Sequence, residues 1–283
     1  MALKATKPVV KNNRLKLFMY GNAKVGKTTL AIQFPKPYII DTEGTTDKEK
    51  YVELINKGDG AVLITQDFDE LVEQVKELLT SKHDFKTLVI DSLTILYNDL
   101  LDKSALKVGT EFGRHYGEAN KKVKHLINLL LRLDMNVIIT SHAKNEYGSK
   151  LEVLGSTFDC YKKLDYIFDL ILEVQKRGKE RVAIVKGTRL KEFEESAIIP
   201  CCYKEFSKRY SVEALERISV AQEIADIYQV NELLRLIDLL KVPRETYEKW
   251  LDKAGSEDWL EMPASAIQKC IDFLTSKIKG EAA

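Results

Sequence analysis

Short apolar runs alternate with amphipathic segments through the first two thirds of the chain. Between the runs, apolar residues recur at intervals of three and four, as in residues 68–79 and 119–133, which is the spacing of one helical face. Strands that are apolar throughout and separated by helices predict an α/β fold, a mainly parallel sheet with helices on both faces. The five runs expected to form strands are residues 15–20, 38–41, 61–64, 87–91 and 136–140.

The pattern changes after residue 165. Two strand-like runs, residues 166–174 and 181–185, are joined by a polar turn, which predicts an antiparallel hairpin added to the sheet. From about residue 213 onward only helical stripes of apolar residues remain. We therefore expect three parts: a loose basic arm over 1–14, an α/β core over 15–212 and a small all-helical domain over 213–283.

Composition narrows the class of protein. The chain has 283 residues, of which 45% are hydrophobic and 31% charged, so it can bury a sizeable core and is not a disordered protein. No apolar run approaches the ~18 residues that span a bilayer, and the first residues lack an apolar signal segment. We expect a cytoplasmic protein with no membrane partner. The four cysteines include no C-x-x-C pair and are expected to be reduced thiols.

Charge is unevenly distributed along the chain. Residues 213–283 hold 14 acidic and 9 basic side chains, a net charge of −5, whereas the preceding residues carry +6. A polyanionic partner is therefore expected to bind the first part of the chain and not the acidic tail.

Residues 21–28 match the phosphate-loop pattern G-x-x-x-x-G-K-[ST], between a predicted strand and a predicted helix. In such a loop, backbone N–H groups surround phosphate oxygens, Lys27 reaches the β- and γ-phosphates, and the Thr28 hydroxyl binds Mg²⁺. The sequence therefore predicts ATP and Mg²⁺ as cofactors. The expected nucleotide-binding residues are Gly21, Asn22, Ala23, Lys24, Val25, Gly26, Lys27, Thr28 and Thr29.

Two carboxylates complete the expected site. Asp91 ends an apolar strand, where an aspartate of the Walker B type would hold Mg²⁺ together with Thr28. Many mechanical ATPases have a glutamate directly after this aspartate, but here the residue is Ser92. Glu43 follows the second strand, at the sheet edge where α/β proteins place ligand contacts, and is the candidate catalytic base. The alternative is that Glu43 is a solvated loop residue.

Residues 40–45, 88–92 and 137–142 resemble the corresponding segments of the RecA-like recombinases, and the resemblance covers residues 15–195. His142 stands where that family has a polar residue that senses the γ-phosphate, usually glutamine or asparagine. The short core, this histidine and the helical tail look most like the phage-encoded RecA-core ATPases of single-strand-annealing recombination systems. The resemblance implies a RecA-like P-loop core with a β-hairpin, followed by helices, in a host bacterial cytoplasm.

The same resemblance implies an ATPase that assembles as a filament or ring and binds single-stranded DNA. It implies one DNA-facing loop over residues 107–117 and another over residues 144–163. It also implies that Lys186 and Arg189 reach the γ-phosphate across a subunit interface. The acidic charge of the helical tail fits the docking of a protein, such as a phage single-strand-binding or annealing protein, or the control of oligomerisation. The expected DNA contacts are Arg114, His115, Tyr116, Lys162 and Lys163.

Other classes of protein share a phosphate loop. A P-loop kinase is one alternative, although no arginine-rich lid is visible after the loop. An oligomeric AAA+-type ATPase acting in replication is another, although it would be expected to carry an acidic pair where this chain has Asp91 and Ser92. A scaffold that binds nucleotide without hydrolysing it is a third, because the loop motif indicates binding and Glu43 alone indicates turnover.

Overall fold

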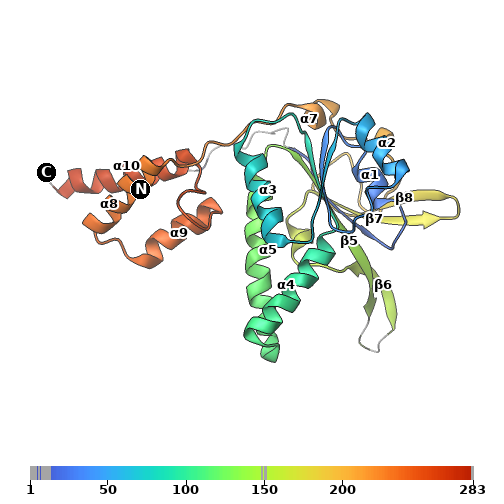
Figure 1. Cartoon of the computed structure of the whole chain (residues 1–283), viewed down its shortest axis with the longest axis horizontal. Coiled ribbons are helices and arrows are strands. Elements are labelled where there is room, and N and C mark those ends of the chain that lie inside the picture. Colours follow the sequence, from blue (N-terminus) through green and yellow to red (C-terminus); the bar gives the residue numbers. More distant parts are fainter. Residues whose placement is uncertain (1–4, 6, 8–13, 148, 150–151, 282–283) are drawn as a thin grey trace. The chain divides into compact units, whose positions relative to one another are not determined.

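The computed structural model describes residues 5, 7, 14–147, 149 and 152–281 (Figure 1), so most of the predicted arm over residues 1–14 lies outside the described residues. The strands are β1 (Lys16–Gly21), β2 (Pro37–Asp41), β3 (Ala61–Ile64), β4 (Thr87–Asp91), β5 (Asn136–Tyr147), β6 (Val153–Phe158), β7 (Leu170–Arg177), β8 (Glu180–Thr188) and β9 (Ile198–Pro200). The helices are α1 (Lys27–Ala31), α2 (Glu49–Lys57), α3 (Phe68–Thr80), α4 (Leu93–Val108), η1 (Glu111–Gly113), α5 (Arg114–Arg132), η2 (Leu164–Tyr166), α6 (Tyr203–Ser207), α7 (Val212–Glu216), α8 (Ile227–Leu239), α9 (Arg244–Ala254) and α10 (Ala264–Glu281). Among these residues, no helix is both long and apolar enough to cross a membrane.

The described strands form one sheet in the order β3-β2-β4-β5-β1-β7-β8-β9, and β6 pairs with β5. The pairs from β2 to β7 are parallel, whereas β7, β8 and β9 are antiparallel. All residues of β1 and β4 are buried, as their uninterrupted apolar sequences predict. The predicted α/β class, a mainly parallel sheet extended by a hairpin and followed by helices, is confirmed.

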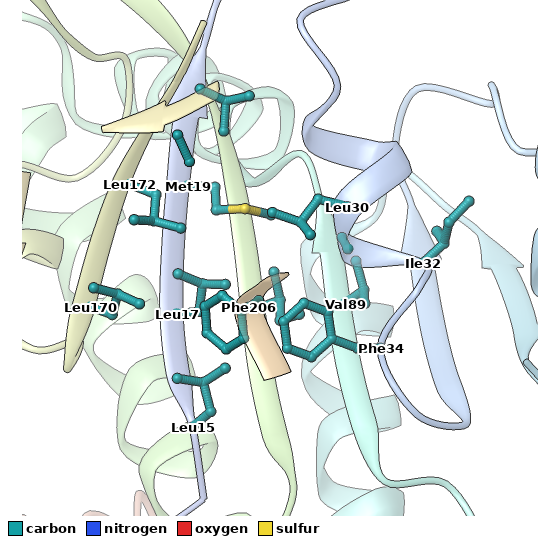
Figure 2. Close-up of a cluster of buried hydrophobic side chains, with 14 of the residues drawn as sticks. Leu15, Leu17, Met19, Leu30, Ile32, Phe34, Val89, Leu170, Leu172 and Phe206 are labelled. Carbon is teal, nitrogen blue, oxygen red and sulfur yellow. The ribbon is translucent and has the colours of Figure 1, made fainter. Parts of the chain in front are cut away.

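One face of the sheet packs against α1 and against α6, the helix that follows β9 (Figure 2). Leu17 and Met19 of β1, with Leu15 directly before this strand, occupy alternate positions and are all fully buried. Leu30 and Phe206 pack on them from outside the sheet. Because the side chains of a strand alternate between faces, every second residue of β1 contributes to this cluster. The cluster fixes β1, and with it the loop that begins at Gly21.

Two hairpins extend the sheet, and only one of them was predicted. The β7–β8 hairpin is present and turns at Gly178, which has a left-handed φ of 60°. The fifth strand is longer than the predicted 136–140, since β5 continues to Tyr147 and pairs with β6. The expectation of a loop over residues 144–163 is therefore wrong for residues 144–147 and 153–158. Apolar and polar residues do not alternate regularly in these two stretches, so the apolar pattern gave no strand signal there.

The described residues group into two compact units. One contains the sheet and consists of the chain up to Leu63 with Phe85–Ser92 and Met135–Ile218; the other consists of Ile64–Asp84, Leu93–Asp134 and the chain from Ser219. The second unit contains α3, α4 and α5 together with the C-terminal helices. The predicted domain boundary at residue 212 stays a prediction.

The apolar helical faces predicted within residues 68–79 and 119–133 are confirmed. The apolar residues of α3 are buried, and so are those of α5 from Ala119 to Leu130. In the C-terminal part, α8 and α10 form their own core through Leu233, Ile267 and Leu274. The neighbouring Leu234 of α8 is 43% exposed. Arg132 of α5 connects this core to the earlier helices, because its guanidinium donates hydrogen bonds to Gln222 and to the carbonyl of Glu261.

The expected DNA-facing loop over residues 107–117 is mostly helical. α4 continues to Val108, η1 covers Glu111–Gly113, and α5 begins at Arg114. Glycines at 109 and 113, both with positive φ, allow the chain to turn between the two long helices. These two glycines therefore belong to a tight connection between helices.

The packing of the sheet leaves no room for a side chain at Gly21, and this can be tested by substitution. A Cβ atom at this position would lie 2.3 Å from the backbone carbonyl oxygen of Val174 in β7, which cannot rotate away. Gly21→Ala should therefore lower the free energy of unfolding by about 3 kcal/mol, the upper part of the usual range for overpacking. Gly155→Ala in β6 is the control, because nothing lies within 4 Å of its added Cβ. Equal denaturant midpoints for the two variants would contradict the packing described here.

Candidate functional site

The carboxyl ends of four neighbouring parallel strands carry most of the predicted site residues. β1 ends at Gly21, β2 at Asp41 and β4 at Asp91, and β5 passes the same edge at His142. Gly21 is in register with His142, and Asp41 with Asp91. Because parallel strands end at a common edge, the segments that follow them are neighbours. The sheet thereby brings together residues far apart in the sequence, such as Glu43 and His142, which are separated by 99 positions.

Residues 21–26 form the loop between β1 and α1. Residues 22–24 are exposed, whereas Val25 is buried and belongs to the core cluster beneath the loop. Lys24 adopts a left-handed φ of 63°, and Gly26 has a φ of 116°. Few residues with a side chain adopt the conformation of Gly26, so the second glycine of the motif is required by the local backbone. The loop is anchored on one side and open to solvent on the other.

The side chain of Lys27 folds back over this loop. Its Nζ atom donates hydrogen bonds to the carbonyl oxygens of Gly21 at 2.8 Å and Asn22 at 3.0 Å. Burial lowers the pKa of the Lys27 ammonium, and the nearby carboxylates of Asp91 and Glu43 act in the opposite direction. A buried ammonium gains stabilisation from an anion, so this position favours the binding of phosphate.

Asp91 is a buried acidic group of the site, with 4% of its surface exposed. The Thr28 hydroxyl donates a hydrogen bond of 2.5 Å to its Oδ2, and the Thr140 hydroxyl donates to its Oδ1. Burial raises the pKa of the Asp91 carboxyl, whereas the two hydroxyl hydrogen bonds act to lower it. A cation close to this carboxylate would offset the cost of keeping it ionised.

Thr28 and Asp91 fit the predicted Mg²⁺ site. They present a hydroxyl and a carboxylate oxygen at the same point, and Mg²⁺ prefers oxygen ligands of this kind. Within the described part of the chain, no group of three or more histidine, cysteine or acidic side chains could hold a metal by itself. Mg²⁺ in proteins commonly keeps several waters and takes further ligands from substrate phosphates. The pair is therefore suited to Mg²⁺ that binds together with a nucleotide.

Glu43 and His142 form a pair beside the loop. The Nε2 atom of His142 lies 2.7 Å from Oε1 of Glu43, and the Oγ atom of Ser92 lies 3.3 Å from the same nitrogen. The side chains of Glu43 and His142 are 34% and 44% exposed, so both are open to solvent. Ser92 stands where many mechanical ATPases have a glutamate. Ser92 and Glu43 therefore both contact His142. Glu43 and His142 are each expected from the sequence, but their contact is not.

Asp41 positions the segment that carries Glu43, a role that sequence analysis missed. Its carboxylate, which is fully buried, accepts hydrogen bonds from the backbone N–H groups of residues 43–46 and from the Thr46 hydroxyl. Five donors on one carboxylate hold this turn in a single conformation. The signal was an aspartate at the end of a strand followed by a glycine turn, a common site of side-chain to backbone bonding.

Lys186 and Arg189 both have partners within their own unit. Lys186 Nζ lies 3.5 Å from a carboxylate oxygen of Glu173. Arg189 lies 3.7 Å from Asp169 and donates a hydrogen bond of 2.5 Å to the carbonyl of Tyr166. Their side chains are 45% and 58% exposed, so they remain accessible. Their predicted contact with a neighbouring subunit stays a prediction.

The predicted DNA contacts fall into two groups. Arg114, His115 and Tyr116 form the first turn of α5, where the rings of His115 and Tyr116 are 4.2 Å apart. Lys162 and Lys163 are exposed and directly precede η2, in the other compact unit. Phe112, which was not among the predicted contacts, is 97% exposed in the turn before α5. An aromatic and cationic surface is thus present around the start of α5.

Comparisons with known proteins identify a family for much of the sequence. No curated protein matches the sequence significantly. Among solved structures, the chain is similar to one described as the crystal structure of the RadB recombinase, with 21% identity and a TM-score of 0.44 over 65% of this chain and 84% of that chain. The family described as "AAA domain" matches residues 13–195, which is more than half of the sequence. The chain therefore belongs to the AAA domain family.

Proposed function

We propose that this protein is an ATP-dependent, RecA-like recombination protein that binds single-stranded DNA and acts as a homo-oligomer. The observation that carries the proposal is the convergence of Lys27, Thr28, Asp91 and Glu43 at one edge of a parallel sheet. Lys27 is suited to bind phosphate and the Thr28–Asp91 pair to hold Mg²⁺. Glu43 adds a solvent-accessible carboxylate, which nucleotide binding alone does not require.

The geometry supports hydrolysis by a positioned base. Lys27 would exchange the carbonyl oxygens of Gly21 and Asn22 for oxygens of the β- and γ-phosphates. When bound, Mg²⁺ supplies neutralisation of the charge that develops on the phosphates. Glu43 accepts a proton from water as the water oxygen attacks the γ-phosphorus. The bond from that phosphorus to the bridging oxygen breaks, and its electron pair leaves with ADP.

His142 is proposed to orient Glu43 and to respond to the γ-phosphate. An ionised carboxylate accepts hydrogen bonds only, so the imidazole donates in the 2.7 Å contact. A γ-phosphate close to this edge would compete with Glu43 for the same donor. The pair thus couples the position of the base to the presence of the third phosphate.

Binding to single-stranded DNA is proposed for two separate surfaces, one around Arg114, His115 and Tyr116 and one at Lys162 and Lys163. Exposed aromatic rings can stack on bases, and arginine and lysine can contact phosphates without regard to sequence. Tyr116 is 48% exposed and Arg114 is exposed beside it. The net charge of +6 before residue 213 supports a polyanionic partner for this part of the chain.

Assembly and biological setting complete the proposal. Lys186 and Arg189 are accessible cations, and those of one subunit are proposed to contact the γ-phosphate bound by the neighbouring subunit. The acidic helices of residues 213–283 are proposed to dock a protein, such as a single-strand-binding or annealing protein of a phage recombination system. Their net charge of −5 disfavours a role in non-specific DNA binding.

Lys27→Ala should weaken ATP binding by at least about 100-fold, because it removes the ammonium that lies against the loop. Isothermal titration with ATP and Mg²⁺ measures the change, and circular dichroism checks that the fold is retained. Lys57→Ala, which removes an exposed lysine at the end of α2, is the control. Undiminished ATP affinity in a folded Lys27→Ala protein would exclude this loop as the nucleotide site.

Glu43→Gln should keep ATP binding but slow hydrolysis at least about 100-fold, the usual scale for a positioned general base. The amide remains able to contact His142 but cannot accept the proton of the attacking water. Phosphate release under single-turnover conditions separates this effect from binding. Glu49→Gln at the start of α2 is a matched control with the same loss of charge. Wild-type turnover in Glu43→Gln would assign the base to another residue.

The double substitution Arg114→Ala with Tyr116→Ala should weaken binding of a fluorescent single-stranded oligonucleotide about tenfold or more. ATP hydrolysis without DNA should be unchanged. The double control Tyr228→Ala with Arg235→Ala removes the same residue types from exposed positions of α8. Substitutions are preferable to deleting residues 213–283, since that deletion would remove partners of Arg132. Equal DNA affinities for the two double variants would move the DNA site elsewhere.

A further inference from the structure

The β7–β8 hairpin contacts both glycines of the phosphate loop. The backbone of Val174 in β7 lies against Gly21, as described above. On the next strand, Arg181 lies against Gly26: a Cβ atom at Gly26 would be 2.7 Å from Cδ and 3.3 Å from Nε of Arg181. The stem of Arg181 therefore runs directly over the turn that precedes Lys27. Sequence analysis assigned no role to this arginine.

Arg181 differs from the two cations of the same region that were predicted to act at the nucleotide. Lys186 is paired with Glu173 and Arg189 with Asp169. Within the part of the chain that the structure describes, Arg181 is exposed and no carboxylate pairs with its guanidinium. A guanidinium held over a phosphate loop without an anionic partner can accept one from the ligand.

The pairing of the hairpin fixes where this side chain points. Arg181 is opposite Lys176 in the antiparallel register, so both side chains leave the hairpin on the same face. Arg177 and Glu180 form the neighbouring pair and therefore point to the other face. Cys201 of the next segment donates its backbone N–H to the carbonyl of Arg181 at 3.0 Å, which holds the backbone of this strand in place.

We propose that Arg181 binds the phosphate chain of the nucleotide held in the loop of the same subunit, with its guanidinium as a second cation beside Lys27. This inference rests on the proposed nucleotide-binding function and adds to it a residue from the hairpin. Guanidinium groups bind phosphate oxygens through paired N–H donors and stay charged at any physiological pH. The hairpin would then contribute to the site through Arg181 from within the subunit, whether or not Lys186 and Arg189 act across an interface.

The test compares Arg181→Gln with Arg177→Gln in the full-length chain. Both variants lose one guanidinium from the same hairpin, but only Arg181 lies over the loop. Isothermal titration with ATP and Mg²⁺ should show about tenfold weaker binding for Arg181→Gln, a typical loss for one charge-assisted contact, and no change for Arg177→Gln. Arg181→Lys should recover part of the affinity because it keeps the charge. Thermal unfolding of each variant checks that the fold is intact, and a loss of affinity in unfolded protein is not counted.

Inorganic tripolyphosphate, used as a competitor of ATP, tests whether the contact is with phosphate. Arg181→Gln should weaken its competition by the same factor as ATP binding. A loss seen with ATP but not with tripolyphosphate would mean that Arg181 contacts the nucleoside, and equal affinities in Arg181→Gln and Arg177→Gln would mean that it makes no contact; either result overturns the inference. Failure of the wild-type chain to bind ATP would instead overturn the proposed function itself.

Discussion

The carboxylate of Asp91 is buried at the end of β4 and accepts hydrogen bonds from the Thr28 and Thr140 hydroxyls, each of which comes from a different neighbouring segment. An ionised carboxylate in this position is costly unless donors or a cation compensate for its lost hydration. The two hydroxyls compensate in part, and they fix the start of α1 and the middle of β5 relative to β4. The proposed nucleotide site is arranged around this buried carboxylate, and a cation added there would offset its charge.

The shape of the phosphate loop depends on the hairpin as well as on the loop's own sequence. Gly21 has no room for a side chain because Val174 of β7 packs against it, and Gly26 combines a positive φ with the close approach of Arg181. Asp41 similarly fixes the turn that carries Glu43, because its carboxylate accepts five hydrogen bonds from that turn. Two short turns, each fixed by a neighbouring strand, thereby place Lys27 and Glu43 at the same sheet edge. Rigid support of this kind is what positions catalytic groups within the tolerance that their chemistry needs.

The parts of the fold that sequence analysis predicted are those in which local pattern and burial agree. Strands β1, β2 and β4 are short apolar runs, α3 and α5 have one apolar face, and the loop at residues 21–28 is marked by its glycines, Lys27 and Thr28. The β5–β6 hairpin was missed because residues 144–147 and 153–158, which pair in it, show no regular apolar alternation. The contacts of His142 with Glu43 and of Arg181 with the loop were missed because they join residues far apart in sequence. Strand order decides such contacts, and no local pattern reveals it.

Turnover of ATP by the full-length chain tests the central claim most directly. Release of inorganic phosphate should be measured with saturating ATP and Mg²⁺, with and without a single-stranded oligonucleotide. The account predicts hydrolysis that requires Mg²⁺ and accelerates when single-stranded DNA is added. ATP binding without any phosphate release in either condition would contradict it, and would leave the protein as a nucleotide-gated scaffold in which Glu43 is not a base.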